Sequence, residues 1–481
     1  MRRRPVARRG QIHFKKTIIC FLLIGMVSAG VILAADLTKE EQSWVAKASR
    51  EERNGWIFLH LEGKPFACGF QHGYLLAKEI AESLRVERYM DWWKTGKEWP
   101  YFVEQTLKMF APKIDPEFRE EMEGIAAGAR KAGVDVSYGD IVLVNASSEI
   151  MGYWYPSSQK DGQPQKTGGC SAFIATGKAT SDGRIVMAHN TWSEFVPASS
   201  NVIIDLRPEK GFRILMQGFP AAIHSGTDFF ICSSGLVGTE TTIDYFKGFD
   251  PGGIPEFVRI RKAMQYARNL DESLKIMIDG NNGGYANTWL FGDVHSNEIA
   301  RLELGLKYHS VERTRDGFYS GSNITENIPL MRQETEADFD NIKHSDIARR
   351  VRWLELFDKW MGKVDVERSK VMLGDHYDVY AGKEMPGDRT ICGHWELAAD
   401  PAGSSADAWA KPFYPAGALD GKVVDARMAQ EMAFWAKWGS SCDIPFDAQK
   451  FLREHRQYNY LKGYLKSRPA QPWTVFKSGS K

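Results

Sequence analysis

Apolar residues recur with one period before residue 155 and with another after residue 170. In the first part they return every three to four positions, a spacing typical of helices that bury one face. Helix start signals, among them the capping box Thr38-Lys39-Glu40-Glu41, set the boundaries. The pattern predicts one short strand at 56–60 and helices at 38–52, 73–93, 101–110, 116–133 and 137–151.

From Cys170 onward the period shortens to two, which is typical of strands with one buried face. The turn Ser181-Asp182-Gly183 joins the first two strands into a hairpin. The predicted strands are 170–176, 184–190, 201–206, 211–217, 229–232, 236–243, 287–293, 299–304, 308–313, 390–397 and 423–427, and the predicted helices are 255–270, 271–279, 346–361 and 366–373. Strands clustered between helical blocks predict an α+β fold, in which helices cover stacked sheets.

A polar, turn-rich segment from Pro156 to Gly169 separates the two parts and ends abruptly at Cys170. We hypothesise that the chain cuts its own Gly169–Cys170 bond, which makes Cys170 a new amino terminus and a nucleophile. The freed α-amine has an ordinary pKa of about 7.7–8.0 and a thiol one of about 8.5, so the two groups can share a proton near neutral pH. Gly168 and Gly169 lack a Cβ and let the backbone bend during the attack. The alternative is a small buried cysteine after an ordinary turn.

Three further stretches bring polar groups toward this cysteine. The hairpin returns His189-Asn190-Thr191-Trp192 beside Cys170, where His189 tunes the thiol or Asn190 donates to an oxyanion. Thr241 lies in a strand rich in hydroxyl groups and positions substrate by hydrogen bonds, although threonine is common in strands for propensity alone. Asn287 leaves a glycine-rich loop and is expected to donate its amide to a developing negative charge.

The cysteines and histidines match no zinc-binding pattern. Cys20 lies in the N-terminal leader, and with Cys170 as nucleophile the remaining four cysteines can form two disulfides in an oxidising compartment. Cys392 with Cys442 is one candidate pair, and buried free thiols are the alternative. Asp375-His376-Tyr377-Asp378 is interpreted as surface or structural, because no second cluster complements it. We therefore expect no metal and no cofactor.

The first 35 residues indicate an export signal. They hold seven basic side chains and no acid, and an apolar run follows from Thr17 to Ala35. The run is long enough for an N-terminal membrane anchor, whereas its small last residues favour cleavage. We expect a periplasmic, secreted or lumenal protein, in which the sequons at Asn145 and Asn323 matter only in a eukaryotic host.

Charge and absent motifs narrow the classes of function. The net charge is +1, and without the seven leader charges it is −6, which disfavours nucleic-acid binding. The chain has no Gly-x-Ser-x-Gly, no P-loop and no His-Glu-x-x-His, so α/β-hydrolases, NTPases and zincins are disfavoured.

The motifs together resemble two related groups of N-terminal-nucleophile (Ntn) hydrolases. Gly169-Cys170-Ser171-Ala172 is similar to the autocleavage site of the phospholipase B-like (lamina-ancestor-like) family and of the peptidase C45 acyltransferase-like family. The stretches at 189–192, 233–242, 285–289 and 412–423 resemble the phospholipase B-like pattern. Gln71-His72-Gly73 is more like the acyltransferase group, but Trp192 stands where that group often has an aspartate.

The resemblance implies an αββα four-layer Ntn-hydrolase sandwich with a helical N-terminal segment. Residues 1–35 are then a signal peptide or anchor, 36–169 the helical N-terminal chain with its linker, and 170–481 the chain that bears the nucleophile. The two chains stay associated after autoprocessing.

The resemblance also implies a role for each matched residue: Cys170 as nucleophile, His189 and Trp192 lining the site, Thr241 contacting substrate or helping maturation, and Asn287 serving the oxyanion. The implied function is hydrolysis of an acyl amide or ester bond in a small-molecule or lipid substrate. Acyl transfer to an amine is one alternative, and a non-catalytic secreted binding protein on the same scaffold is the other.

Overall fold

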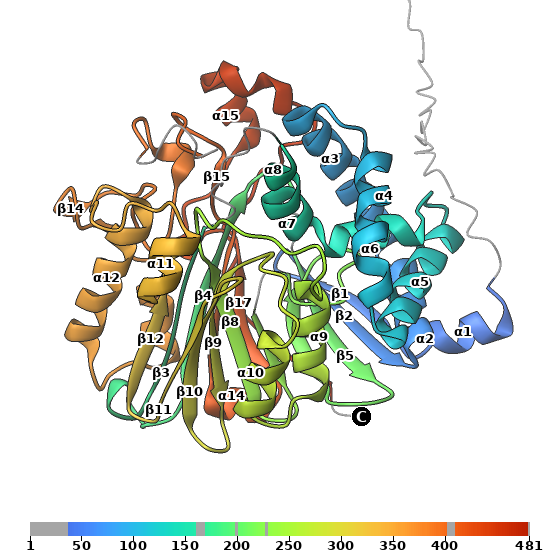
Figure 1. Cartoon of the computed structure of the whole chain (residues 1–481), viewed down its shortest axis with the longest axis horizontal. Helices are drawn as coiled ribbons and strands as arrows, with labels where there is room; N and C mark the ends of the chain where they lie inside the picture. Colours follow the sequence, from blue (N-terminus) through green and yellow to red (C-terminus); the bar gives the residue numbers. More distant parts are fainter. Residues whose placement is uncertain (1–36, 160–168, 198–200, 227–228, 402–408, 480–481) are drawn as a thin grey trace, which may run out of the picture. The chain divides into compact units, whose positions relative to one another are not determined.

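Two β-sheets pack face to face in the middle of a four-layer α+β fold (Figure 1). The structure is a computed structural model that describes residues 37–159, 169–197, 201–226, 229–401 and 409–479. Apolar side chains such as Trp56, Ile174 and Leu290 fill the space between the sheets. A layer of helices covers the outer face of each sheet, so the predicted αββα arrangement is confirmed.

The larger sheet has nine strands, which are antiparallel except for the neighbours β2 and β5. In spatial order they are β1 (Ser49–Arg53), β2 (Trp56–Gly63), β5 (Val202–Pro208), β6 (Ile214–Gly218), β7 (Phe229–Cys232), β8 (Leu236–Thr242), β9 (Asn287–Asp293), β10 (Glu298–Leu304) and β11 (His309–Thr314). Strand β1 corrects the predicted first helix. The capping box at Thr38 does open α1 (Lys39–Val45), but residues 49–53 pair with β2 instead of continuing it.

Helices from the N-terminal part cover this sheet, together with two that follow β8. They are α2 (Pro65–Leu75), α3 (Ala77–Thr95), α4 (Trp99–Phe110), α5 (Pro116–Lys131), α6 (Tyr138–Asn145), α9 (Glu256–Tyr266) and α10 (Leu270–Ile278). Helices α2 and α5 touch backbone to backbone, because a Cβ on Gly69 or Gly73 would lie only 1.9 Å from a carbonyl oxygen of α5. Glycine is therefore required on this face of α2.

The smaller sheet has seven strands. They are β12 (Gly317–Gly321), β3 (Gly169–Thr176), β4 (Val186–Glu194), β15 (Ala416–Ala418), β16 (Asp420–Asp425), β17 (Ala433–Trp438) and β18 (Thr474–Lys477). The predicted hairpin of β3 and β4 is confirmed, although β4 continues past Asn190 to Glu194. Residues 390–397 are wrongly predicted as a strand, because they form a loop with one 3-10 turn at Trp395–Leu397.

Helices α12 (Ser345–Trp360) and α13 (Val366–Leu373) cover the smaller sheet, where Phe173 packs edge-on against Trp353 and Phe357. The remaining elements are α7 (Ser147–Glu149), the π-helical turn Ile150–Trp154, α8 (Tyr155–Ser158), α11 (Ile328–Glu334), α14 (Ala426–Gln430), α15 (Ala448–Glu454) and the hairpin β13 (Tyr377–Asp378) with β14 (Lys383–Glu384). Within the described residues no helix combines the length and apolarity needed to cross a bilayer. The predicted leader and most of the predicted linker, residues 160–168, lie outside the described residues.

Candidate active site

The side chain of Cys170 points into the space between the two sheets. In the pairing of β3 with β4, Cys170 lies opposite Thr191 and Ala172 lies opposite His189. Directly opposed residues of an antiparallel pair share a face of the sheet, and Ala172 belongs to the core between the sheets. Cys170, Thr191 and His189 therefore share this inner face, with His189 as the diagonal neighbour of Cys170 at about 7–8 Å. Cys170 is only 6% exposed.

The backbone N–H of Cys170 donates a hydrogen bond to the side chain of Asn323. In a continuous sheet, the backbone of the neighbouring strand β12 would accept this bond. Strand β12 pairs with β3 as far as Gly321, which lies opposite Ala172. Continued pairing would set residue 323 opposite residue 170, but Asn323 has a φ of 71° and leaves the strand. Its Oδ1 accepts a hydrogen bond from the Cys170 N–H at 2.9 Å, while its Nδ2 donates to the Thr242 carbonyl at 2.8 Å. The carboxamide thus links both sheets at the nucleophile.

Arg349 of α12 holds the other side of Cys170. This guanidinium is fully buried and donates to the carbonyl oxygen of Cys170 and, at 2.9 Å each, to Asn323 Oδ1 and Asp346 Oδ1. Burial lowers the pKa of Arg349, and the negative charges available at Asp346, Asp244 and Cys170 oppose that shift.

Trp192 covers the Gly169–Cys170 bond from the outer face of the sheet. It lies opposite Gly169 in the strand pairing, and the Arg349 guanidinium stacks over its ring at 4.2 Å. A Cβ on Gly169 would lie 2.8 Å from the Trp192 ring and 3.3 Å from that of Trp409. The indole therefore packs on the peptide bond on the opposite side from the sulfur.

His189 is a neutral imidazole next to a buried lysine. Burial, followed by the charge of Lys422, lowers the pKa of His189 well below its ordinary value of 6.5. Lys422 lies directly opposite His189 on β16 and forms an ion pair of 2.7 Å with Asp420. It also donates to Thr191 and Gln217, so a connected polar group lies on the inner face beside Cys170.

Thr241 and Asn287 come from the larger sheet. The Thr241 hydroxyl reaches toward the smaller sheet, since a Cβ on Gly321 would lie 2.4 Å from it. Asn287 is paired with Thr242, and the alternation of side chains puts it on the opposite face of the sheet from Thr241, at the end of β9. Among the described residues neither the Thr241 hydroxyl nor either amide atom of Asn287 has a hydrogen-bond partner. Such unsatisfied buried groups are rare and call for an explanation, such as a bound ligand.

A cavity of about 200 Å³ is lined by a residue of β4, the strand that pairs with the strand of Cys170. Ser193 lines it and lies two residues beyond Thr191 on β4, a distance of about 7 Å along the strand. Glu87 and Glu149 also line it, and burial raises the pKa of Glu87 to about 8 and that of Glu149 to about 7. The cavity therefore offers protonatable carboxyl groups, which suit a polar, uncharged ligand group.

Two motifs are structural. Asn190 points outward, where its Nδ2 donates to the carbonyls of Leu373 and Ile391 and its Oδ1 accepts from Ser441, so an oxyanion role for Asn190 is wrong. His72 is buried at a helix–sheet contact, where its Nε2 accepts a hydrogen bond from the Ala221 N–H at 3.0 Å.

The interpretation of His376 as isolated is also wrong. Cys392, His394 and Cys442 gather around it, and their ligand atoms all lie within 4.8 Å of one another. Cys392 and Cys442, the candidate disulfide pair, are neighbours but carry separate thiols.

No pattern in the sequence indicates a role in the site for Asn323, Arg349 or Asp346. Asn323 stood out only as a sequon, yet it is 2% exposed and its side-chain nitrogen is engaged. Arg349 lies in a helix rich in charges, where a charged residue is usually solvated. Only their distance from Cys170 in the fold reveals these residues.

Comparison with known proteins connects this site to a family. The family model for Phospholipase B matches residues 118–307, a segment that contains Cys170, His189, Trp192, Thr241 and Asn287. The resemblance to the phospholipase B family is confirmed. Phospholipase B-like 1 from Bos taurus is 23% identical over 438 residues, which cover 77% of this chain and 75% of the bovine protein.

Other similar proteins match shorter parts. A protein of Archaeoglobus fulgidus is 28% identical over 297 residues, covering 57% of this chain and 47% of its own length, so this chain spans about half of that relative. Putative phospholipase B-like 2 from Rattus norvegicus is 29% identical over 144 residues, covering 26% of this chain and 24% of the rat protein. The crystal structure of a mutant conjugated bile acid hydrolase from Clostridium perfringens has a TM-score of 0.32 and 10% identity, and covers 56% of this chain and 89% of that chain. A score at that level does not establish a shared fold.

Proposed function

We propose that this chain is an exported, self-cleaving cysteine hydrolase of an acyl amide or ester bond. The observation that carries the proposal is the cradle around Cys170, in which Asn323 binds its N–H and Arg349 binds its carbonyl. Both contacts persist if the Gly169–Cys170 bond is cut, and Asn323 Oδ1 then accepts from a free α-amine. The sulfur, the amine and the cavity then share one end of the sandwich.

In the maturation step, the Cys170 sulfur attacks the carbonyl carbon of Gly169. A thioester forms as the C–N bond breaks, and the departing nitrogen takes a proton to become the α-amine. Water then hydrolyses the thioester, which leaves a carboxylate on Gly169 and restores the thiol. Trp192 and Arg349 keep the bond in place on the outer face during this sequence.

In turnover, the thiol passes its proton to the α-amine and attacks the acyl carbon of the substrate. The same amine protonates the departing amine or alcohol, and water hydrolyses the thioester. The Thr241 hydroxyl, which lacks a partner among the described residues and faces the smaller sheet, is proposed to bind the substrate. The Asn287 amide also lacks a partner among the described residues, but it lies on the other face of the larger sheet, so the oxyanion role proposed for it requires access around the end of β9. His189 is neutral and is assigned a positioning role next to Lys422.

Intact-mass and N-terminal analysis of the purified protein tests the proposal. We expect two associated chains, the second of which begins at Cys170. Cys170→Ala should give one uncut chain, whereas Cys232→Ala, which removes another buried thiol, should be cut like the parent. An uncut chain that is still active refutes the mechanism. Adding an amine acceptor to the assay separates hydrolysis from acyl transfer, and failure of acyl-directed electrophiles to label Cys170 indicates a non-catalytic binding protein.

A further inference from the structure

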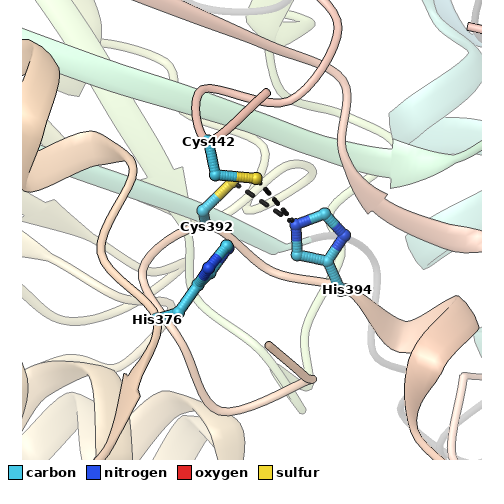
Figure 2. Close-up of side chains that lie close together, drawn as sticks. All are labelled: His376, Cys392, His394 and Cys442. Atoms are coloured by element: carbon cyan, nitrogen blue, oxygen red, sulfur yellow. Dashed lines mark hydrogen bonds between the residues drawn. The ribbon is translucent and has the colours of Figure 1, made fainter. Parts of the chain in front are cut away.

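Four side chains from three separate segments lie close together (Figure 2). The residues just before Cys392 and Cys442 are hydrogen-bonded to Asn190, which points outward from β4. His376 follows α13, Cys392 and His394 flank Gly393 in the next loop, and Cys442 follows β17. Figure 2 shows their ligand atoms turned toward one another. We propose that His376, Cys392, His394 and Cys442 together bind one zinc ion as a structural site.

The distances between these side chains fit tetrahedral zinc. The Nε2 atom of His394 lies 3.7 Å from the Cys392 sulfur and 3.2 Å from the Cys442 sulfur. Zinc binds sulfur at about 2.3 Å and nitrogen at about 2.0–2.1 Å, so a tetrahedral site separates a sulfur ligand from a nitrogen ligand by about 3.6 Å. The measured separations agree with that value to within about half an ångström. The four ligand atoms all lie within 4.8 Å of one another, so small movements of the side chains would bring them onto one ion.

A carboxylate orients one of the histidines. The Nδ1 atom of His394 lies 2.8 Å from Glu396 Oε1, and a proton on Nδ1 satisfies this contact. The lone pair of Nε2 then faces both sulfurs. Metal-binding histidines are typically held in this way by a carboxylate on their other ring nitrogen. The arrangement is thus built around His394 as a ligand and not only as a buried base.

The set of ligands selects the kind of metal and its role. Two thiolates and two imidazoles suit zinc, and two thiolates balance its double charge. All four positions are occupied by protein, which is typical of structural sites; catalytic zinc keeps one position for water. A disulfide between Cys392 and Cys442 is the competing chemistry, but it gives no role to His376, His394 or the Glu396 contact.

The site would brace the strand next to the nucleophile. Gly393, between two of the ligands, packs so closely on Trp192 that a Cβ there would lie 2.3 Å from the indole. Asn190 of β4 is hydrogen-bonded to the carbonyl of Ile391 and the hydroxyl of Ser441, which are the residues just before Cys392 and Cys442. Zinc would therefore link the loops that support β4 from outside and would take no part in the chemistry at Cys170.

Metal analysis of the full-length protein, purified without chelator, tests the proposal. We expect about one zinc per chain by plasma mass spectrometry, and loss of that zinc in Cys442→Ser and in His376→Asn. Cys232→Ala is the control, because Cys232 is a free cysteine that lies in the core on the helix-covered side of the larger sheet, and this variant should retain the metal.

Two measurements on the parent protein keep the test independent of variant folding. After removal of zinc, titration with Co²⁺ should give the visible absorption of a tetrahedral thiolate site at one equivalent. Non-reducing peptide mapping should find Cys392 and Cys442 unlinked. A Cys392–Cys442 linked peptide in metal-free protein, or no Co²⁺ binding by reduced protein, overturns the proposal. Neither result depends on whether Cys170 is cut, so the two proposals fail separately.

Discussion

The substitution Gly169→Ala separates packing from chemistry at the predicted cleavage site. On a Cys170→Ala background no self-cleavage is expected, so unfolding reports packing alone. The added Cβ would lie 2.8 Å from Cε3 of Trp192, well inside the about 3.5–4.0 Å at which carbon atoms attract each other. The indole has little room to move away, because Gly393 and the Arg349 guanidinium already contact it.

Overpacking of this kind costs about 1–3 kcal/mol, or roughly a 5-fold to 150-fold shift in the unfolding equilibrium. Urea denaturation measures it as a lower midpoint with an unchanged slope. Gly387→Ala is the control, since the nearest atom to its Cβ lies at 3.8 Å, and its free energy of unfolding should change by less than about 0.5 kcal/mol. If Gly169→Ala and Gly387→Ala unfold at the same urea concentration, the packing explanation is wrong.

Gly169→Ala in a chain that keeps Cys170 measures the effect on the rate of self-cleavage. Alanine restricts the backbone bend that the attack on residue 169 requires, so the two-chain product should accumulate more slowly than in the parent. Mass spectrometry of freshly folded protein over time gives the rate. A destabilised variant that is cut at the parental rate would show that Gly169 serves packing only.

Three other substitutions test separate contacts. Asn323→Ala leaves the Cys170 N–H without its acceptor, which should lower the free energy of unfolding by about 1–3 kcal/mol. The variant should also react more slowly with electrophiles at Cys170. Labelling and stability equal to those of the parent would contradict the proposed role of Asn323 in holding Cys170. Burial, and then the charge of Arg261, lowers the pKa of His72 to about 3. Below about pH 6.5 the unfolded chain therefore takes up a proton at this residue, whereas the folded chain does not. Between pH 6.5 and 5 the parent should therefore lose about 2 kcal/mol more stability than His72→Gln in urea titrations, and parallel curves would refute this. Glu396→Gln should weaken zinc binding about 10-fold to 100-fold in competition with a chelating dye, and unchanged affinity would show that the carboxylate does not support His394.

Local patterns in the sequence were sufficient to predict stacked sheets covered by helices. The change of period near residue 170 separates the helical part from the sheets because side-chain alternation depends only on neighbouring residues. The turn at Ser181-Asp182-Gly183 likewise fixes the hairpin that brings His189 to the same face as Cys170. The first helix was predicted too long, because the pairing of residues 49–53 with β2 outweighs the local preference for helix. The roles of Cys170, Trp192, Thr241 and Asn287 remain predictions.

The sequence pattern by itself indicated stacked sheets covered by helices and the position of a candidate nucleophile at the start of a strand, and the family resemblance added the αββα order of the layers. Only the tertiary structure decided what surrounds that nucleophile. Asn323 reaches the Cys170 N–H because β12 pairs with β3 across about 150 residues and then stops, and no local pattern encodes such a register. His376, Cys392, His394 and Cys442 meet for the same reason: hydrogen bonds from β4 and packing on Trp192 bring together segments that are remote in the chain.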